Sequence, residues 1–161
     1  MSVPPPSAKA AIPPRDGVTL TPADGDVPVA DNLRRLGVPA PRPAVVLVVD
    51  DEVSVLIATR RILTRYGYTV LEAAGGEAAL RVASENAALI DVVLTDVRMP
   101  GLDGPALVAR LSGILRTLRV VYTSGYTDGR LEQELSTPGC VFLPKPFTIE
   151  QLTRTLAELL A

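Results

Sequence analysis

The sequence predicts an α/β domain with a doubly wound parallel sheet, on two observations over residues 44–161. Short apolar runs rich in β-branched residues recur there, which is typical of strands covered on both faces of a parallel sheet. Stretches with helical periodicity lie between these runs, and the alternation favours five strands wound with five helices. The expected strands are AVVLVV (44–49), YTVLEA (68–73), IDVVLT (90–95), LRVVYT (118–123) and CVFL (140–143).

The first intervening helix is expected to bury an apolar stripe, because four residues recur at helical spacing. They are Val55, Ala58, Ile62 and Tyr66. Gly67 follows them and suits the position just past a helix end. A second helix is expected over residues 75–87, which are rich in the helix formers Ala and Glu.

Three more helices are expected towards the end of the chain. The third is marked by an apolar series and by a proline in its first turn, where proline is tolerated; these residues are Leu107, Leu111, Ile114 and Pro105. A short fourth helix is expected over residues 127–135. The last starts at Thr148, because Gln151 stands at the capping-box spacing, and its expected buried stripe is Ile149, Leu152, Leu156 and Leu159.

Residues 1–43 differ from the rest of the chain in composition. They hold ten of the fifteen prolines, and proline breaks helices and removes sheet donors. We therefore expect a proline-rich, disordered leader over residues 1–43 and one folded domain over residues 44–161. A helical turn over residues 31–37, and a role for the leader as a tether or docking segment, are alternatives that the sequence leaves open.

Composition excludes several classes of function. The formal net charge is −2 and Lys and Arg form no basic block, which argues against direct binding of nucleic acid. The chain has no histidine, so mechanisms that need an internal imidazole are excluded. Cys140 is the only cysteine; no internal disulfide is possible, and we interpret it as a small core residue. With no membrane span or signal peptide in the sequence, a cytoplasmic location is expected.

Polar residues stand at the carboxyl ends of four of the expected strands. Doubly wound domains bind ligands at this edge of the sheet, so these residues are expected to share a site. They are Asp50 and Asp51 after the first strand, Asp96 after the third, Ser124 with Gly125 after the fourth, and Lys145 between two prolines after the fifth. The second strand offers only Glu72, which fits a strand away from the site.

Each of these residues also has a simpler interpretation. Asp50 and Asp51 could cap the following helix, and Asp96 could form the turn before Met-Pro-Gly. Ser124 could be an ordinary loop hydroxyl and Lys145 a solvated lysine. The coincidence of all of them at one sheet edge favours the shared site.

The set is chemically coherent as a phosphoryl-transfer site. Crowded carboxylates repel one another unless a hard cation neutralises them, and Mg²⁺ with carboxylate, water and phosphate ligands suits such a site. Asp96 is then expected to attack a phosphoryl group and form an aspartyl phosphate. Lys145 would supply a second positive charge, the Ser124 hydroxyl would donate to a phosphoryl oxygen, and Gly125 would leave room for the group.

Residues 44–161 resemble the receiver domain of two-component response regulators, on the motifs VVDDE, LTDVRMPGLDG, YTSGYTD and LPKPF in this order. SGYTD and LPKPF together resemble receivers attached to hybrid histidine kinases more than those of DNA-binding regulators. The resemblance implies a flavodoxin-like (βα)5 fold with strand order 2-1-3-4-5. It also implies a phosphorelay signalling domain that has no separate enzymatic substrate.

The resemblance further implies a role for each site residue: Asp96 as phosphoacceptor, Asp50, Asp51, Asp96 and the backbone carbonyl of Arg98 as holders of Mg²⁺, Lys145 as a catalytic cation, Ser124 as switch hydroxyl and Phe142 as the aromatic that swings inward. The phosphodonor would be a histidine kinase or a histidine phosphotransfer protein, which suits a chain without histidine. A downstream protein would then bind the face made by the fourth helix, the fifth strand and the fifth helix.

Three positions depart from the commonest pattern of that family. Ser124 stands where Thr is commoner and keeps the hydroxyl, whereas Phe142 stands where Tyr is commoner and lacks one. Arg98 is bulky and cationic, and we expect it to alter the access of attacking water.

Three other functions are disfavoured. A phosphohydrolase of the haloacid-dehalogenase type needs a second Asp two residues after its nucleophile on the first strand, where counting from Asp50 gives Glu52, and it usually needs a cap domain. A receiver used only for binding would lack an acidic residue, the acceptor or the lysine, and none is missing. A DNA-binding regulator is disfavoured because the sequence ends one helix after Lys145.

Overall fold

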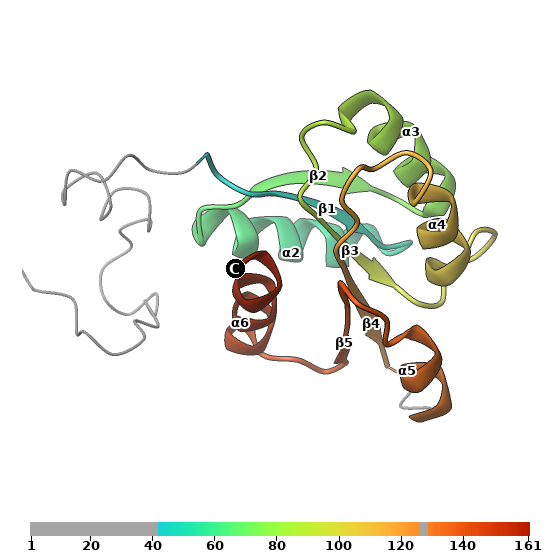
Figure 1. Cartoon of the computed structure of the whole chain (residues 1–161). Helices are drawn as coiled ribbons and strands as arrows, with labels where there is room; N and C mark the ends of the chain where they lie inside the picture. Colours follow the sequence, from blue (N-terminus) through green and yellow to red (C-terminus); the bar gives the residue numbers. More distant parts are fainter. Residues whose placement is uncertain (1–41, 126–128) are drawn as a thin grey trace, which may run out of the picture.

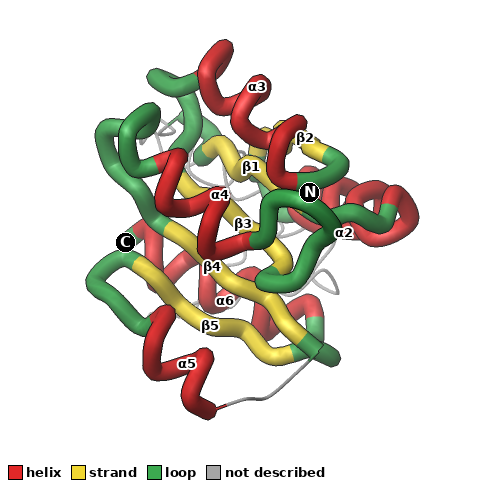
Figure 2. Tube along the Cα trace, turned by 90° about the vertical axis from the view of Figure 1, so that its right-hand side faces the viewer, coloured by secondary structure: helices red, strands yellow, loops and turns green. Residues whose placement is uncertain are grey.

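Five strands form one parallel sheet in the order β2-β1-β3-β4-β5. The computed structural model describes residues 42–125 and 129–161, so the expectations for residues 1–41 lie outside the described residues. The strands are β1 (Val45–Val49), β2 (Thr69–Ala73), β3 (Val92–Asp96), β4 (Val120–Ser124) and β5 (Cys140–Pro144). Figure 2 shows them side by side in this order. The predicted fold class and strand order are confirmed.

Helices cover both faces of the sheet. They are α2 (Val53–Arg65), α3 (Gly76–Asn86), α4 (Gly104–Leu111), α5 (Gly129–Leu135) and α6 (Ile149–Leu160). Figure 1 shows α2 and α6 on one face and α3, α4 and α5 on the other. All five residues of β1 are buried, as the continuous apolar run predicted for a strand with helices on both sides.

The core consists of two layers and a smaller cluster. Leu56 and Leu63 of α2 pack with Leu152 and Leu156 of α6 against one face of the central strands. On the opposite face, α3 and α4 pack on residues that include Leu47 of β1. A third cluster joins α5 to β4 and β5. The layers hold the central strands from both sides, which fixes the position of their carboxyl ends.

The predicted buried stripe of α2 is wrong. The buried residues of this helix are Leu56, Thr59 and Leu63, whereas Ala58 is exposed and the others of the expected stripe, Val55, Ile62 and Tyr66, are only partly buried. The predicted and the observed series both have helical spacing, and packing against the sheet favours the observed one because it buries two leucines. The observed series was not recognised in the sequence because the polar Thr59 stands in its middle. Gly67 does follow the helix with φ +86°, as predicted.

The last helix begins with the predicted capping box. Thr148 Oγ1 accepts a hydrogen bond from the Gln151 amide (3.1 Å), and Gln151 Oε1 accepts one from the Thr148 amide (2.8 Å). Leu152 and Leu156 are fully covered, but Ile149 is 45% exposed, contrary to prediction. Ile149 is the first helical residue, and it lies outside the cluster that the two leucines form with the sheet.

Two other helix boundaries differ from expectation. The third predicted helix ends at Leu111, so Ile114 lies in the turn that follows, although it still packs against the core. The fourth runs from Gly129, and the two residues predicted before it lie outside the described residues. No helix within the described ranges is both long and apolar enough to cross a membrane.

Candidate functional site

Three carboxylates meet at the carboxyl edge of the sheet. Asp50 follows β1 and Asp96 ends β3, and these two strands are neighbours. Asp50, Asp51 and Asp96 each offer an oxygen, and the three oxygens lie within 4.8 Å of one another. The first of the three is buried and Asp51 is exposed, so the cluster opens towards solvent. The edge predicted from strand order therefore does bring the three carboxylates together.

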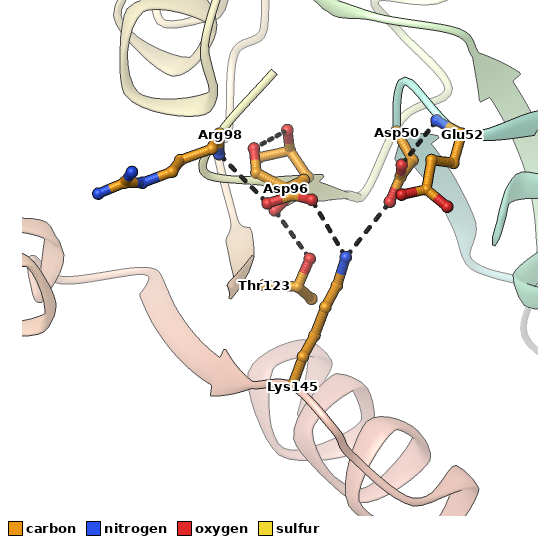
Figure 3. Close-up of polar contacts among 7 residues, drawn as sticks. Asp50, Glu52, Asp96, Arg98, Thr123 and Lys145 are labelled. Atoms are coloured by element: carbon orange, nitrogen blue, oxygen red, sulfur yellow. Dashed lines mark hydrogen bonds and ion pairs between the residues drawn. The ribbon is translucent and has the colours of Figure 1, made fainter. Parts of the chain in front are cut away.

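Lys145 joins two of these carboxylates. Its Nζ lies 3.1 Å from Asp96 Oδ2 and 3.5 Å from Asp50 Oδ2, and Figure 3 shows the side chain reaching up between them. Its backbone amide donates to the Ser124 carbonyl (2.8 Å), which fixes the base of the side chain to the end of β4. Cation and carboxylates thus lie in one site, as the four strand ends predicted.

In both aspartates that contact Lys145, the other carboxylate oxygen accepts a hydrogen bond from a backbone amide. The Glu52 amide donates to Asp50 Oδ1 (2.9 Å), and the Arg98 amide donates to Asp96 Oδ1 (3.2 Å). Each aspartate therefore presents its Oδ2 to Lys145. Glu52 is the N-cap residue of α2 and its side chain makes no capping hydrogen bond. The alternative interpretation of Asp50 or Asp51 as the cap of this helix is therefore not supported.

The Arg98 side chain extends away from Asp96 in Figure 3 and is exposed. Ser124, the predicted switch residue, is 2% exposed at the end of β4. Phe142 is partly buried and pairs in register with Tyr122, in the cluster that joins α5 to the sheet. Both residues thus lie on the strands beside the carboxylates.

Three residues that support the site were not predicted. Thr95 and Thr123 are buried behind Asp96, where Thr95 Oγ1 donates to the Asp96 carbonyl (3.0 Å) and Thr123 Oγ1 to the Thr95 carbonyl (3.4 Å). A Cβ on Gly104 would collide with the Asp96 carbonyl oxygen. The sequence signal for Gly104 was its place directly before Pro105, which marked the first turn of the predicted third helix.

The charges of the site are tightly coupled. Burial raises the pKa of Asp50, assisted by the charges of Asp96 and Asp51, although the Glu52 amide and Lys145 oppose the shift. For Lys145, burial works to lower the pKa, but the hydrogen bond and charge of Asp96, with those of Asp50, raise it overall. Lys145 therefore stays charged, whereas the negative charge of the buried Asp50 carboxylate is unfavourable in the folded state.

Replacing Asp50 by Asn is expected to stabilise the folded chain at pH 7 in a chelating buffer. A raised pKa means that folding favours the protonated Asp50 carboxyl. The contribution of this group to the stability of the fold is fully present below about pH 4 and is lost as the pH rises through the pKa of the folded state. Asn stays neutral and can still accept from the Glu52 amide, so the variant escapes this loss.

We expect a gain of about 4 °C in melting temperature at pH 7, on the order of 1 kcal/mol, and almost none at pH 4. Thermal unfolding followed by circular dichroism across this range measures the difference. The exposed Glu158→Gln variant is the control. A lower melting temperature for Asp50→Asn at pH 7 would contradict the electrostatic argument.

Two residues outside the site match their predictions. Glu72 of β2 is exposed and pairs with Arg60 of α2 (3.3 Å), away from the carboxylate cluster. Cys140 is a free thiol, partly buried in the cluster at β5. Neither takes part in the arrangement of carboxylates and lysine.

Comparison with known proteins identifies the family to which this fold and site belong. A family model described as the response regulator receiver domain matches residues 46–157. The chain is 39% identical over 118 residues to the sensor kinase CckA of Brucella abortus, covering 73% of this chain and 12% of that protein. It is 30% identical over 108 residues to the sporulation initiation phosphotransferase F of Bacillus subtilis, covering 66% of this chain and 86% of that protein.

A solved structure supports the match. The crystal structure of the receiver domain of the hybrid histidine kinase CckA aligns with a TM-score of 0.64 and 42% sequence identity, over 73% of this chain and all of that one. The chain spans about an eighth of the full CckA sequence, so the comparison concerns the receiver alone. With the fold, the strand order and the four strand ends in place, the chain belongs to the response regulator receiver domain family and is a phosphorelay signalling domain.

Proposed function

We propose that Asp96 accepts a phosphoryl group from a phosphohistidine of a partner protein in a Mg²⁺-dependent reaction. The observation that carries this proposal is the cluster of three carboxylate oxygens within 4.8 Å, with Lys145 bound to two of the aspartates. Of the three aspartates, only Asp96 lies at the last residue of a strand and is partly exposed. A nucleophile must be reachable, and buried Asp50 is not.

The donor set fits Mg²⁺, which prefers a few carboxylate oxygens and retains water. Asp50, Asp51, Asp96 and the backbone carbonyl of Arg98 would hold it. When bound, the metal offsets negative charge on the phosphoryl oxygens. Its charge would also counteract the burial and the neighbouring negative charges that raise the pKa of Asp50.

In the proposed reaction an Asp96 carboxylate oxygen attacks phosphorus as the phosphorus–nitrogen bond to the donor imidazole breaks. The imidazole leaves with the electron pair of that bond and takes a proton from solvent. Lys145 Nζ, already 3.1 Å from Asp96 Oδ2, attracts the phosphoryl oxygens during transfer. The Arg98 amide holds the other carboxylate oxygen at 3.2 Å, which orients the nucleophile. These residues position and neutralise charge, which is most of what phosphoryl transfer requires.

The donor would be a histidine kinase or a histidine phosphotransfer protein, because the chain has no histidine of its own. After transfer, Ser124 would move towards the phosphoryl group and Phe142 would bury, which shifts the population between two states of the face made by α5, β5 and α6. A downstream protein would bind one state. The chain would assist its own phosphorylation and dephosphorylation without a separate substrate.

We also propose a division of the chain and a location for it in the cell. We divide the chain into a leader over residues 1–43 and a receiver over residues 44–161, which includes the matched range 46–157. A single cysteine in a free thiol state fits a reducing compartment, and we propose a cytoplasmic location.

Intact-mass spectrometry tests the proposed reaction. The full chain is incubated with acetyl phosphate, with Mg²⁺ or with a chelator. We expect one phosphoryl adduct with Mg²⁺ and almost none with the chelator. If neither acetyl phosphate nor a phosphorylated histidine phosphotransfer protein produced an adduct, the proposal would be wrong. Turnover of a generic phosphate ester would instead favour a phosphohydrolase.

A further inference from the structure

Helix α2 is strongly basic in a chain that is acidic as a whole. Its sequence, VSVLIATRRILTR, holds three arginines and no acidic residue, whereas the chain has a formal net charge of −2. The arginines occupy the second half of the helix. Together with Thr64 they line an open hollow of about 370 Å³; they are Arg60, Arg61 and Arg65.

The exposed surface of α2 also has apolar residues. Val53 is 60% exposed and Ile57 is 39% exposed. Arg60 pairs with Glu72 (3.3 Å), an exposed ion pair that contributes little to stability. The outer side of α2 therefore offers positive charge along its second half and uncovered apolar area along its first half.

The leader joins the domain beside the arginine end of α2. Arg42 makes two hydrogen bonds to the Asp91 carboxylate, of 3.0 and 2.8 Å. The Ala44 carbonyl accepts from the Thr69 amide (2.9 Å), and Thr69 follows α2 by one short turn. Figure 1 shows the described chain entering at the same end of the sheet where α2 ends. The described chain thus begins at the edge of the sheet where the arginine half of α2 ends.

One part of the leader is complementary to this surface. Residues 16–31, DGVTLTPADGDVPVAD, contain four aspartates and no Lys or Arg. Valines and a leucine stand between the aspartates. Such a segment can place carboxylates near guanidinium groups and apolar side chains near apolar ones, and Arg binds carboxylates well through its fork of donors.

We propose that residues 16–31 lie along the outer side of α2 of the same chain. Asp31 precedes Arg42 by 11 residues, which span up to about 36 Å when extended, and a 13-residue helix is about 20 Å long. The connection is therefore long enough to reach the whole helix. It is also short enough to keep the segment at an effective concentration of roughly millimolar, so weak contacts suffice.

Disulfide trapping in the full chain tests the contact. In a Cys140→Ser background, Ala30→Cys is combined either with Thr64→Cys on α2 or with Ser84→Cys on α3. Both partner positions are exposed and lie one or two residues before the end of their helix, at the same end of the sheet but on opposite faces. Under a mild oxidant we expect the Thr64 pair to form roughly tenfold faster than the Ser84 pair.

Charge dependence provides the second measurement. Changing Asp24, Asp26 and Asp31 to Asn should reduce the Thr64 rate to the Ser84 rate, and so should 1 M salt, which shortens the screening length to about 3 Å. Equal rates at the two positions, or no effect of the Asn changes, would overturn the proposal. A rate that rises with protein concentration would assign the contact to a second copy and also overturn it. None of these measurements needs Mg²⁺ or phosphate, so their outcome is independent of the proposed role of Asp96.

Discussion

Asp96→Asn is expected to gain no phosphoryl group from acetyl phosphate and Mg²⁺. The amide of Asn has the shape of the carboxylate but is not a nucleophile, so the bond to phosphorus cannot form. The substitution also removes one charge from a crowded cluster, so the variant should fold and be at least as stable as the wild type. Intact mass measures the adduct, and circular dichroism shows that the variant is folded.

Asp103→Asn is the matched control for this change. Asp103 ends the loop that follows Asp96, is exposed, and caps α4 by accepting from the Ala106 amide (2.9 Å). Asn caps helices about as well as Asp, so this variant should be phosphorylated as the wild type is. An adduct on Asp96→Asn, or its loss in the control, would place the acceptor elsewhere.

Lys145→Met is expected to slow adduct formation by about 10²–10³-fold, the usual effect of removing one preorganised group that neutralises developing charge. The ammonium group lies within 3.5 Å of two carboxylates, and its backbone is fixed through the Ser124 carbonyl. Met retains the length and apolar stem of the side chain but has no charge. The phosphoryl oxygens would then have to approach two carboxylates without this cation.

The rate is measured as initial adduct formation at saturating Mg²⁺, with Arg154→Met as control. Arg154 is exposed and pairs with Glu150 on α6 (2.8 Å), so its removal takes away one positive charge without touching the cluster. We expect Mg²⁺ still to raise the melting temperature of Lys145→Met, because the carboxylates remain. A rate within about twofold of the wild type would show that Lys145 is not catalytic.

The carboxylates and the lysine could be predicted because strand position alone determines where they lie. In a parallel sheet every carboxyl end is at one edge, and the strand order places β1, β3, β4 and β5 in succession along it. Asp50, Asp96 and Lys145 therefore lie close together. The runs of β1, β3 and β4 are buried almost throughout, whereas β2 and β5, at the edges of the sheet, are more exposed. The predicted limits of all five strands lie within two residues of the observed ones. The type of residue then determined the chemistry.

Side-chain packing could not be predicted in the same way. Two faces of α2 have helical spacing, and only the shape of the sheet beneath decides that Leu56 and Leu63 are buried. Gly104 is required by the approach of α4 to the Asp96 carbonyl, a contact between segments that no local pattern records. Thr95 and Thr123 act through backbone carbonyls, and a buried threonine in a strand has no distinctive sequence signal.

The hydrogen bond from the Lys145 amide to the Ser124 carbonyl has a consequence for how such a domain can be tuned. It ties the residue that would sense the phosphoryl group to the residue that would help install it. A substitution that repositions the end of β4 also repositions the ammonium group, so the duration of the signal and the strength of the response cannot be adjusted separately at these two positions. Independent adjustment has to come from residues that take no part in this hydrogen bond, and the exposed Arg98 is one of them.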